Sequence, residues 1–458
     1  MTPRRAAGAL RRLVDRAGAA APRSRERYRR AAATFAAQLA SQGVALLVLL
    51  ASVPLALGYL GRERFGLWMT AVAAAELLSF ASLGLDKGLL NALADADGRD
   101  DRAAARRLVS TAFALVAAIV LALLALLALT YRALPWARLL NVAASEEAGP
   151  VMAVLIVAAL LALPASLVDT VQSAYQEGFL NGLWKATGRV LSLVALAAAI
   201  ALGASVVWVA LAVAGAPLLA ALGNAIVLFG RRRPWLAPRL TEMRRDAARR
   251  LFGAGSLFFL TQLALTIAYY ADNLIVAQLA GSGAVAAYAV TARLFDLPGM
   301  LLLLVGAAAW PPLAEAIARG DSAWAERGLR RLIIASLGLA ALTALPLMLL
   351  GPTLLGWWVG GEVAPPDQLF IAFGLFWLLS AVTQPIAVFL AAANALRLQL
   401  GCAVLLAAGS VALKLLMAPA FGMAGIAWGR VAAEALLLVP YGLCLPRLMR
   451  QVRRGAAG

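Results

Sequence analysis

Charge-poor stretches of about 20 residues recur along the whole chain, and they constrain its fold more than any other feature of the sequence. About 20 apolar residues are the length that a helix needs to cross the hydrocarbon core of a bilayer. The ends of spans found in this way are accurate to about four residues. We expect twelve spans, at 35–57, 66–90, 108–130, 151–172, 183–204, 206–229, 251–279, 284–310, 328–351, 367–391, 398–419 and 422–446.

The composition agrees with a membrane protein and favours helices over a barrel. Hydrophobic residues make up 63% of the chain and charged residues only 14%, and the mean hydropathy is +0.84. A soluble domain is much less apolar. The Leu, Ala and Val runs are continuous, whereas barrel strands would alternate over about ten residues. The sequence therefore predicts an all-α integral membrane protein.

The formal net charge of +18 could indicate nucleic acid, but its distribution indicates membrane topology instead. Loops on the outer side would hold only Arg62, Arg64, Arg132 and Arg138. The remaining loop arginines concentrate at both ends and in one central segment, and the positive-inside rule places such segments in the cytoplasm. We therefore expect both termini in the cytoplasm and no nucleic-acid partner.

The polar segment 230–250 divides the twelve expected spans into two sets of six. The expected domains are a basic cytoplasmic arm (1–34), a six-helix bundle (35–229), a basic cytoplasmic linker (230–250), a second six-helix bundle (251–446) and a cytoplasmic tail (447–458). A weak internal sequence similarity supports this division, because LGRERFGLWM at 60–69 resembles LAGSGAVAAY at 279–288. Halves with an even number of spans would be parallel repeats about an axis along the membrane normal.

Catalytic and metal chemistry are poorly supported by the sequence. The chain has no His, and its two cysteines, Cys402 and Cys444, fall inside expected spans, so zinc and disulfides are poorly supported. The longest outer loops, about 131–150 and 352–366, leave little room for an extramembrane catalytic domain. We expect no enzyme activity, no catalytic residue, no metal site and no cofactor.

Four stretches carry characteristic glycines and turn residues: YLGRERFGLW (59–68), LGLDKGLLNALADADGRDD (83–101), YYADNLIVAQLAGSGAVAAYAVTARL (269–294) and WPPLAEAIARGD (310–321). They resemble the polysaccharide and O-antigen flippases, in the same order and over roughly residues 35–446. Those flippases belong to a superfamily that also holds multidrug/toxin extruders and lipid II flippases. The resemblance assigns no function to individual residues of this chain.

The resemblance implies a V-shaped pair of six-helix bundles, as in multidrug/toxin extruders, around a central cavity. It implies alternating access that moves an undecaprenyl-pyrophosphate-linked oligosaccharide from the inner to the outer leaflet of the bacterial inner membrane, for surface polysaccharide assembly. The implied partners are this lipid-linked oligosaccharide, membrane lipids, and the polysaccharide polymerase and chain-length machinery.

Other functions stay open. A cation-coupled multidrug/toxin exporter of the same fold would favour an acidic cavity, and a lipid II flippase commonly carries two extra helices that are not found here. A membrane glycosyltransferase or ligase would need catalytic carboxylates beside a substantial outer domain. A scaffold without transport also stays open, because a fold does not fix a function.

A flippase for an anionic lipid needs cationic groups for the pyrophosphate, and the second bundle offers three. Counting about 1.5 Å per residue from the outer ends, Arg293, Arg430 and Lys414 lie roughly 8 to 14 Å deep. Asp296 and Glu434 lie about a turn further in, at i,i+3 from Arg293 and i,i+4 from Arg430, so that each pair can share a helix face. Internal neutralisation and phosphate binding are both compatible with this spacing. We expect a net positive cavity that Arg293 and Arg430 face.

The first bundle offers further candidates near the cytoplasmic ends of its spans. Lys87, Lys185 and Arg189 are candidate cations for first capture of the head group, with Asp86 and Asp169 close by. Snorkelling of long side chains at helix ends explains these positions as well.

Asp272 is the lone charge between Leu251 and Ala280. A lone ionisable group in hydrocarbon costs at least about 2.5 kcal/mol, so it is expected to have a partner or a use. The turn at 281–283 leads into the span of Arg293, and antiparallel neighbours would bring the two side chains to similar depth. We therefore expect an Asp272–Arg293 pair, with ion coupling as the other role. Glu76, near the middle of its span, is a candidate for pairing or proton coupling.

Overall fold

All regular secondary structure is helical in the residues that the computed structural model describes, which are 22–142, 145–175 and 177–455. The first half comprises α2 (Pro22–Glu76), η1 (Leu77–Ser82), α3 (Leu85–Gly98), α4 (Arg102–Thr130), α5 (Trp136–Leu140), α6 (Ser145–Ala174), α7 (Gly178–Ala201) and α8 (Val206–Val227). The second half comprises α9 (Arg245–Ala280), α10 (Ser282–Leu294), α11 (Asp296–Ala318), α12 (Ser322–Val359), α13 (Asp367–Ala392), α14 (Leu396–Phe421), α15 (Met423–Leu436) and α16 (Leu438–Gly455).

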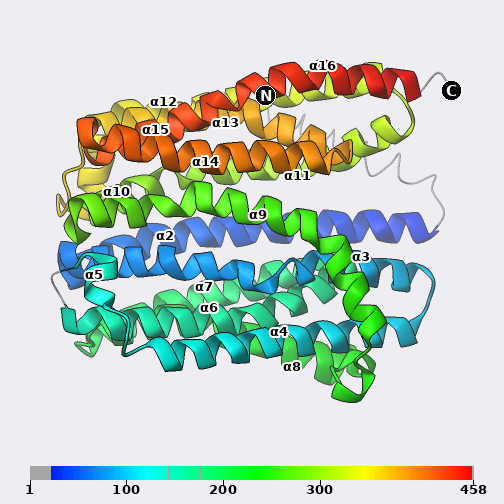
Figure 1. Cartoon of the computed structure of the whole chain (residues 1–458), viewed down its shortest axis with the longest axis horizontal. Coiled ribbons are helices and arrows are strands. Elements are labelled where there is room, and N and C mark those ends of the chain that lie inside the picture. Colours follow the sequence, from blue (N-terminus) through cyan, green and yellow to red (C-terminus); the bar gives the residue numbers. More distant parts are fainter. Residues whose placement is uncertain (1–21, 143–144, 176, 456–458) are drawn as a thin grey trace.

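The helices lie side by side along the long axis of the molecule, as a membrane bundle requires. Figure 1 shows α2 to α8 in one group and most of α9 to α16 in the other. Helices α2 and α9 lie where the two groups meet. In the described part of the chain, eleven helices are long and apolar enough to cross a membrane. The prediction of an all-α membrane protein with about twelve helices in two bundles is confirmed.

The second span of each half is broken, which the hydropathy did not predict. The expected span 66–90 is divided into the end of α2, the 3-10 turn η1 and the start of α3. The expected span 284–310 is likewise divided into α10 and α11, which meet at Phe295. Of α3, α10 and α11, only α11 is long and apolar enough by itself to count as a membrane span.

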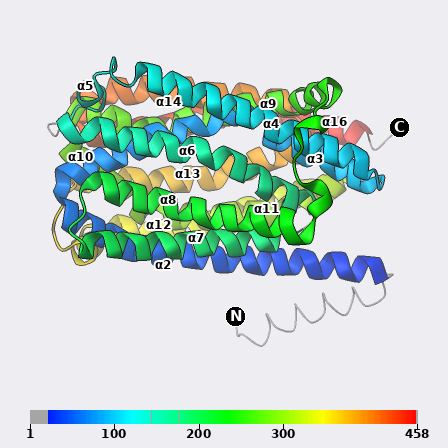
Figure 2. The same ribbon diagram turned by 90° about the horizontal axis from the view of Figure 1, so that it is seen from below.

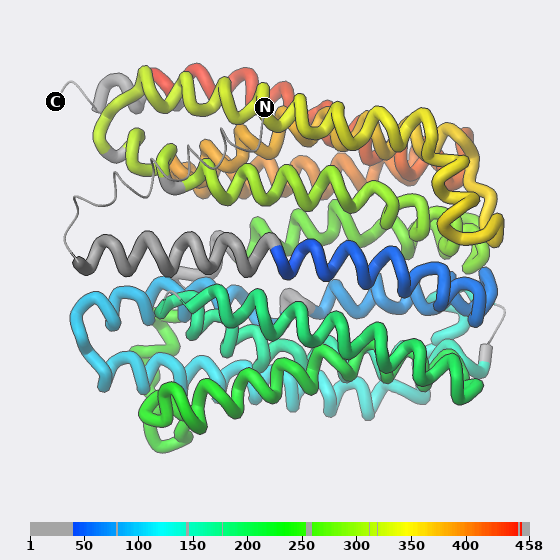
Figure 3. The backbone as a smooth tube through the Cα atoms, turned by 180° about the vertical axis from the view of Figure 1, so that it is seen from behind, coloured from blue at the N-terminus to red at the C-terminus, as the bar shows by residue number. Residues whose placement is uncertain are grey.

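Two glycines give the two halves the same turn between their first and second spans. Gly61 has φ 73° and ψ 171° inside the stretch assigned to α2, and Gly281 has φ 80° and ψ 171° between α9 and α10. A positive φ is accessible to glycine without a steric penalty. The tube in Figure 3 reaches one end of the molecule with the first span and then returns. The weak sequence similarity between the halves is therefore matched by the same backbone turn in each half.

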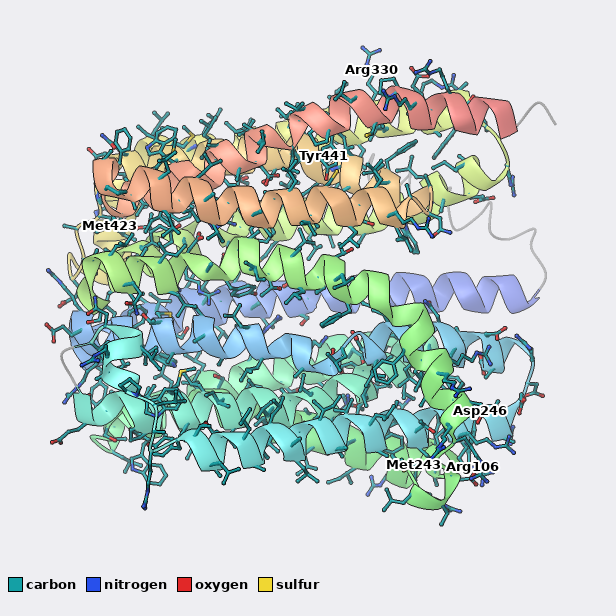
Figure 4. All side chains as sticks on the ribbon, in the orientation of Figure 1. Arg106, Met243, Asp246, Arg330, Met423 and Tyr441 are labelled. Carbon is teal, nitrogen blue, oxygen red and sulfur yellow. The ribbon has the colours of Figure 1, made fainter. Side chains whose placement is uncertain are left out.

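The segment between the halves packs on the first half, at the end of the molecule that we call the linker end. Arg233 pairs with Glu177 at 3.0 Å and lies over the ring of Tyr175 at 3.7 Å. The backbone N–H groups of Arg239 and Arg244 donate to hydroxyls on α4, at 3.1 and 3.2 Å. Figure 2 shows the start of α2 and the end of α16 at this same end, and Figure 4 shows Met243 beside Arg106. Helix α9 begins at Arg245, so the last six residues of the expected 230–250 linker are helical.

The two halves also meet at the opposite end, which we call the sealed end. Trp358 Nε1 donates to the carbonyl of Leu50 at 2.8 Å, and Asn141 Nδ2 donates to that of Ala277 at 2.8 Å. A Cβ on Gly66 would lie 1.8 Å from the carbonyl oxygen of Ser282, so the backbones of α2 and α10 are in contact there. The sealed end is therefore closed by contacts between the halves.

Candidate functional site

A cavity of about 690 Å³ lies between the halves, and the second half supplies most of its wall. Its lining comes from α9, α10, α11, α13, α14 and α15, with Tyr441 of α16, which Figure 4 labels. Among the described residues of the first half, those that line it all lie on α2, namely Met69, Val72, Ala73 and Glu76. Any ligand held here would therefore contact mainly the second half.

Asp272 is the centre of a buried charge cluster on the cavity wall. The hydroxyl of Tyr288 donates to Asp272 Oδ2 at 2.7 Å, and Lys414 Nζ is in direct contact with Oδ1. Arg430 Nη1 lies 3.5 Å from Oδ2. Asp272 is 4% exposed and Lys414 is fully buried, so this ion pair is largely shielded from water. Two cations share one carboxylate, which leaves the cluster with a formal charge of +1.

Helix spacing places these groups together. Ala268 and Asp272 are one turn apart on α9, and Ser410 and Lys414 are one turn apart on α14. Ser410 Oγ and Lys414 Nζ both donate to the carbonyl of Ala268, which fixes α14 against α9. A Cβ on Gly429 would lie 2.5 Å from the backbone nitrogen of Lys414, so only glycine allows α15 to come this close to α14.

The guanidinium of Arg430 lies against two aromatic rings at the cavity wall. Its carbon Cζ lies 3.9 Å from the ring centre of Phe376 and 5.0 Å from that of Tyr269. Such contacts stabilise a cation over a ring face. A guanidinium has five N–H donors, and the contact to Asp272 uses one nitrogen, Nη1. Arg430 lines the cavity and so can present further donors to an anionic ligand.

Arg293 and Asp296 lie at the break between α10 and α11 and form an ion pair of 3.2 Å. Both line the cavity, with side chains 45% and 34% exposed. Glu76, at the last position of α2, lines the same cavity from the first half. Glu76 follows Gly61 by fifteen residues, and Asp296 follows Gly281 by the same number, so the two carboxyls hold corresponding positions in the two halves.

The expected pair of Asp272 with Arg293 is wrong. Asp272 contacts Tyr288, Lys414 and Arg430, and Arg293 pairs with Asp296. Five residues separate Tyr288 from Arg293 on α10, which turns Arg293 away by about 140° when each residue advances the helix by about 100°. Similar depth in the membrane therefore did not bring the two groups onto facing sides.

The ion pair between Arg430 and Glu434 that their spacing allows is not formed. Thr383 Oγ1 donates to Glu434 Oε1, and the carboxylate beside Arg430 is Asp272. Glu434 is 2% exposed, and among the described residues no basic side chain forms an ion pair with it. Glu434 is therefore a buried carboxyl whose partner is a neutral hydroxyl.

The cavity does not show the expected excess of basic groups. Arg293 and Arg430 line it, and Lys414 lies buried behind Asp272. The acidic lining groups are Glu76, Asp272, Asp296 and Glu434. Among the described residues, the lining thus holds two basic side chains and four acidic ones.

The candidates of the first half lie away from this cavity. Lys185 pairs with Asp169 at 3.0 Å, and Arg189 Nη1 donates to the carbonyl of Ser41 at 2.7 Å. Asp86 and Lys87 lie in the first turn of α3. None of the basic candidates Lys87, Lys185 and Arg189 lines the cavity, and the same holds for Asp86 and Asp169.

Sequence reasoning missed the aromatic and hydroxyl groups that hold the charges. Tyr288, Tyr269, Phe376 and Thr383 each contact one of the charged side chains. These four residues lie 16 to 161 residues from their charged partners in the chain, and no spacing rule links them. Nothing in a single sequence marks these residues among the many other apolar and hydroxyl side chains.

A membrane-spanning bundle of two halves around a charged cavity defines a multi-pass membrane transporter, and the comparisons with known proteins agree. The profile of the polysaccharide biosynthesis protein family matches residues 29–318, and that of the MatE family matches residues 258–406. The chain belongs to the polysaccharide biosynthesis protein family, within the superfamily that includes the multidrug/toxin extruders. Its relatives are transporters rather than enzymes.

Solved structures share the fold at low sequence identity. An inward-facing multidrug resistance MATE family transporter of the MOP superfamily has a TM-score of 0.78 and 17% identity, over 89% of this chain and 96% of that one. An outward-facing structure has a TM-score of 0.69 and 17% identity, over 92% and 96%. A MOP superfamily transporter from Pyrococcus furiosus, described as having a binding pocket of reverse polarity, has a TM-score of 0.60 and 17% identity, over 89% and 96%. No curated protein matches the chain.

Proposed function

We propose that this protein is a flippase that moves an undecaprenyl-pyrophosphate-linked oligosaccharide across the bacterial inner membrane for the assembly of O-antigen or another surface polysaccharide. The family supports a flippase, and the position of Arg430 supports an anionic cargo. Arg430 packs against Phe376 and Tyr269 at the cavity wall and has donors beyond its contact with Asp272. A planar guanidinium with free donors suits the two oxygens of a phosphate.

Arg293 would be the second contact for the pyrophosphate. It is more exposed than Arg430, and Asp296, with which it forms an ion pair, follows it by three residues. An exposed pair of this kind is worth little in stability and can exchange partners readily. A pyrophosphate between Arg293 and Arg430 would replace one carboxylate contact by a stronger charge-assisted one.

The proposed orientation places the linker end in the cytoplasm. The loops there are rich in arginine, as the positive-inside rule requires for cytoplasmic loops. The contacts at the sealed end would then close the outer side, and the larger TM-score with the inward-facing transporter agrees with this. The lipid-linked cargo would enter from the inner leaflet, and the polymerase and chain-length machinery would receive it on the outer side.

The test is polysaccharide export in a strain whose own flippase gene is deleted and replaced by this one. The variant Arg430→Gln keeps a similar size but removes the charge, and we expect export to fall at least tenfold at an equal amount of protein in the membrane. The control Arg319→Gln removes a charge whose partner is Glu315 on the same helix turn, and it should export normally. Normal export by Arg430→Gln would contradict the proposal.

A cation-coupled multidrug exporter is the second candidate, and two carboxyls favour it. Glu76 and Glu434 line the cavity, and among the described residues neither forms an ion pair. Such groups can carry protons or attract cationic drugs. Vesicles containing the purified protein would decide, because accumulation of a cationic dye driven by an ion gradient, and lost in Glu434→Gln, supports the exporter and not the flippase.

A further inference from the structure

A groove of about 590 Å³ lies between α12 and α16, separate from the central cavity. Its apolar walls are Leu329, Ile333 and Ile334 on α12 and Leu445, Pro446 and Met449 on α16. Ile334 is 58% exposed, so the groove opens on the outer surface of the second half rather than toward the first half. In a membrane, this surface faces lipid, and an apolar groove there is filled by hydrocarbon.

The rim of the groove is charged, in contrast to its apolar walls. Arg330 on α12 and Arg450 on α16 line it, with Glu326 beside Arg330. Figure 4 labels Arg330 next to the distal part of α16, at the linker end of the molecule. Arg450 Nε donates to the backbone carbonyl of Pro446 at 3.3 Å, and this bond leaves the terminal amino groups of the guanidinium for a ligand.

The surroundings of the rim are also basic. Arg327 and Arg331 are exposed on α12, and Arg447 is exposed on α16. Basic pockets between membrane helices at the level of the head groups bind anionic lipids. An apolar groove with such a rim matches a molecule that has acyl chains below and a phosphate above.

We infer that the groove between α12 and α16 is a binding site for one anionic glycerophospholipid. Its phosphate lies between Arg330 and Arg450, and an acyl chain lies along Ile334 and Leu445. The arginine-rich arm at residues 1–21 fits the groove poorly because it would bring like charge to the rim, and a second copy of the chain would bring the same arginines. The site does not depend on the nature of the transported cargo.

Native mass spectrometry of the delipidated full-length protein tests this. We expect phosphatidylglycerol to bind more tightly than phosphatidylcholine with the same acyl chains. The variant Arg330→Gln/Arg450→Gln should weaken phosphatidylglycerol binding by on the order of tenfold or more, since each basic residue near a lipid surface contributes about fivefold. The matched control Arg231→Gln/Arg232→Gln removes two exposed arginines from the linker end of the first half and should leave the tightest site unchanged.

A second variant tests the apolar half of the site without changing charge. Ile334→Trp fills the groove at an exposed position and should also weaken phosphatidylglycerol binding, while melting of the protein stays normal. Unchanged binding in Ile334→Trp would reduce the site to one for phosphate alone. Equal losses in both arginine pairs would show general surface attraction, and tighter binding of a polyprenyl phosphate would assign the groove to the cargo; each result overturns the inference.

Discussion

Lys414 is a fully buried ammonium group, and its only acidic neighbour in the described cluster is Asp272. Its terminal nitrogen also donates to the carbonyl of Ala268, so the side chain links α14 to α9 in two ways. A buried charge is tolerated when it is paired and hydrogen-bonded. Lys414 therefore acts as a structural counter-ion that fixes Asp272, and Arg430 is the cation of this cluster that a ligand can reach.

Removing one member of this pair should destabilise the protein strongly. Asp272→Asn leaves the fully buried ammonium of Lys414 without its carboxylate, and the loss expected for an uncompensated buried charge is about 3 to 5 kcal/mol. The double variant Lys414→Met/Asp272→Asn should recover much of this loss, because it no longer contains the buried ammonium. Thermal unfolding in detergent measures both effects, and a double variant no more stable than Asp272→Asn would contradict the pairing.

Loss of the Tyr288 hydroxyl should destabilise the protein less than Asp272→Asn does. Tyr288→Phe removes the hydroxyl that donates to Asp272 and keeps the ring, so the expected loss is about 1.5 to 3 kcal/mol, as for a hydrogen bond to a charged group. The same unfolding measurement checks it. Thr291→Val is a suitable comparison, because the Thr291 hydroxyl donates only to a backbone carbonyl of its own helix, and its loss should be smaller.

The site could be predicted only in part from the sequence. Scarcity of charge in the spans selected Asp272, Arg293, Lys414 and Arg430 as candidates. Their partners could not be predicted, because they depend on which face of α14 meets α9 and on how closely α15 approaches α14. Lys414 and Asp272 are 142 residues apart in the chain, and their contact exists only after these helices pack.

Among the elements, α14 and α15 show how two glycines set the distance between helices. Besides Gly429, Gly425 lies against the backbone of α14, where a Cβ would meet the carbonyl oxygen of Met417 at 2.3 Å. Small residues four apart are a common device for close helix contact in membranes. The close approach brings Arg430 beside the Asp272 and Lys414 pair.

Gly429→Ala should push α15 away from α14. The expected destabilisation is about 1 to 3 kcal/mol, as for overpacking of a close contact. Gly409→Ala is the control, because its new Cβ would meet Leu436 at an ordinary 3.5 Å. If the two variants unfold at the same temperature, the close approach of the helices is not important for stability.

At the level of elements, hydropathy predicted the spans but not their interruptions. The six residues of η1, LLSFAS, are as apolar as the helices around them, so no drop in hydropathy marks the break. Phe295, where α10 meets α11, is itself apolar. One acidic residue, Glu76 or Asp296, lies at each of the two breaks.

For the whole molecule, alternating access requires the sealed end to open. The side chain of Gln278 on α9 donates to the carbonyl of Leu139 on α5, so these two exposed positions lie close together across the halves. In a variant without Cys402 and Cys444, we expect Leu139→Cys/Gln278→Cys to be joined by oxidation or by a short bifunctional reagent. The joined protein should stop exporting polysaccharide, and reduction of the disulfide should restore export.

Each single cysteine variant serves as the control, and it should export normally under the same oxidising conditions. Full export by the joined protein would show that the two halves do not separate at this end during transport. That result would also show that the cargo does not leave through an opening at the sealed end.

The contacts that close the sealed end have main-chain acceptors, namely the carbonyls of Leu50, Leu139 and Ala277. Every amino acid carries such a carbonyl, so the identity of the accepting residue is unconstrained by these bonds. Only the donor positions, Trp358, Gln278 and Asn141, need a particular side chain. Among homologous chains, substitutions at the donor positions should therefore occur without matching substitutions at the acceptor positions. An analysis of correlated variation between positions would then not detect the contacts of the sealed end.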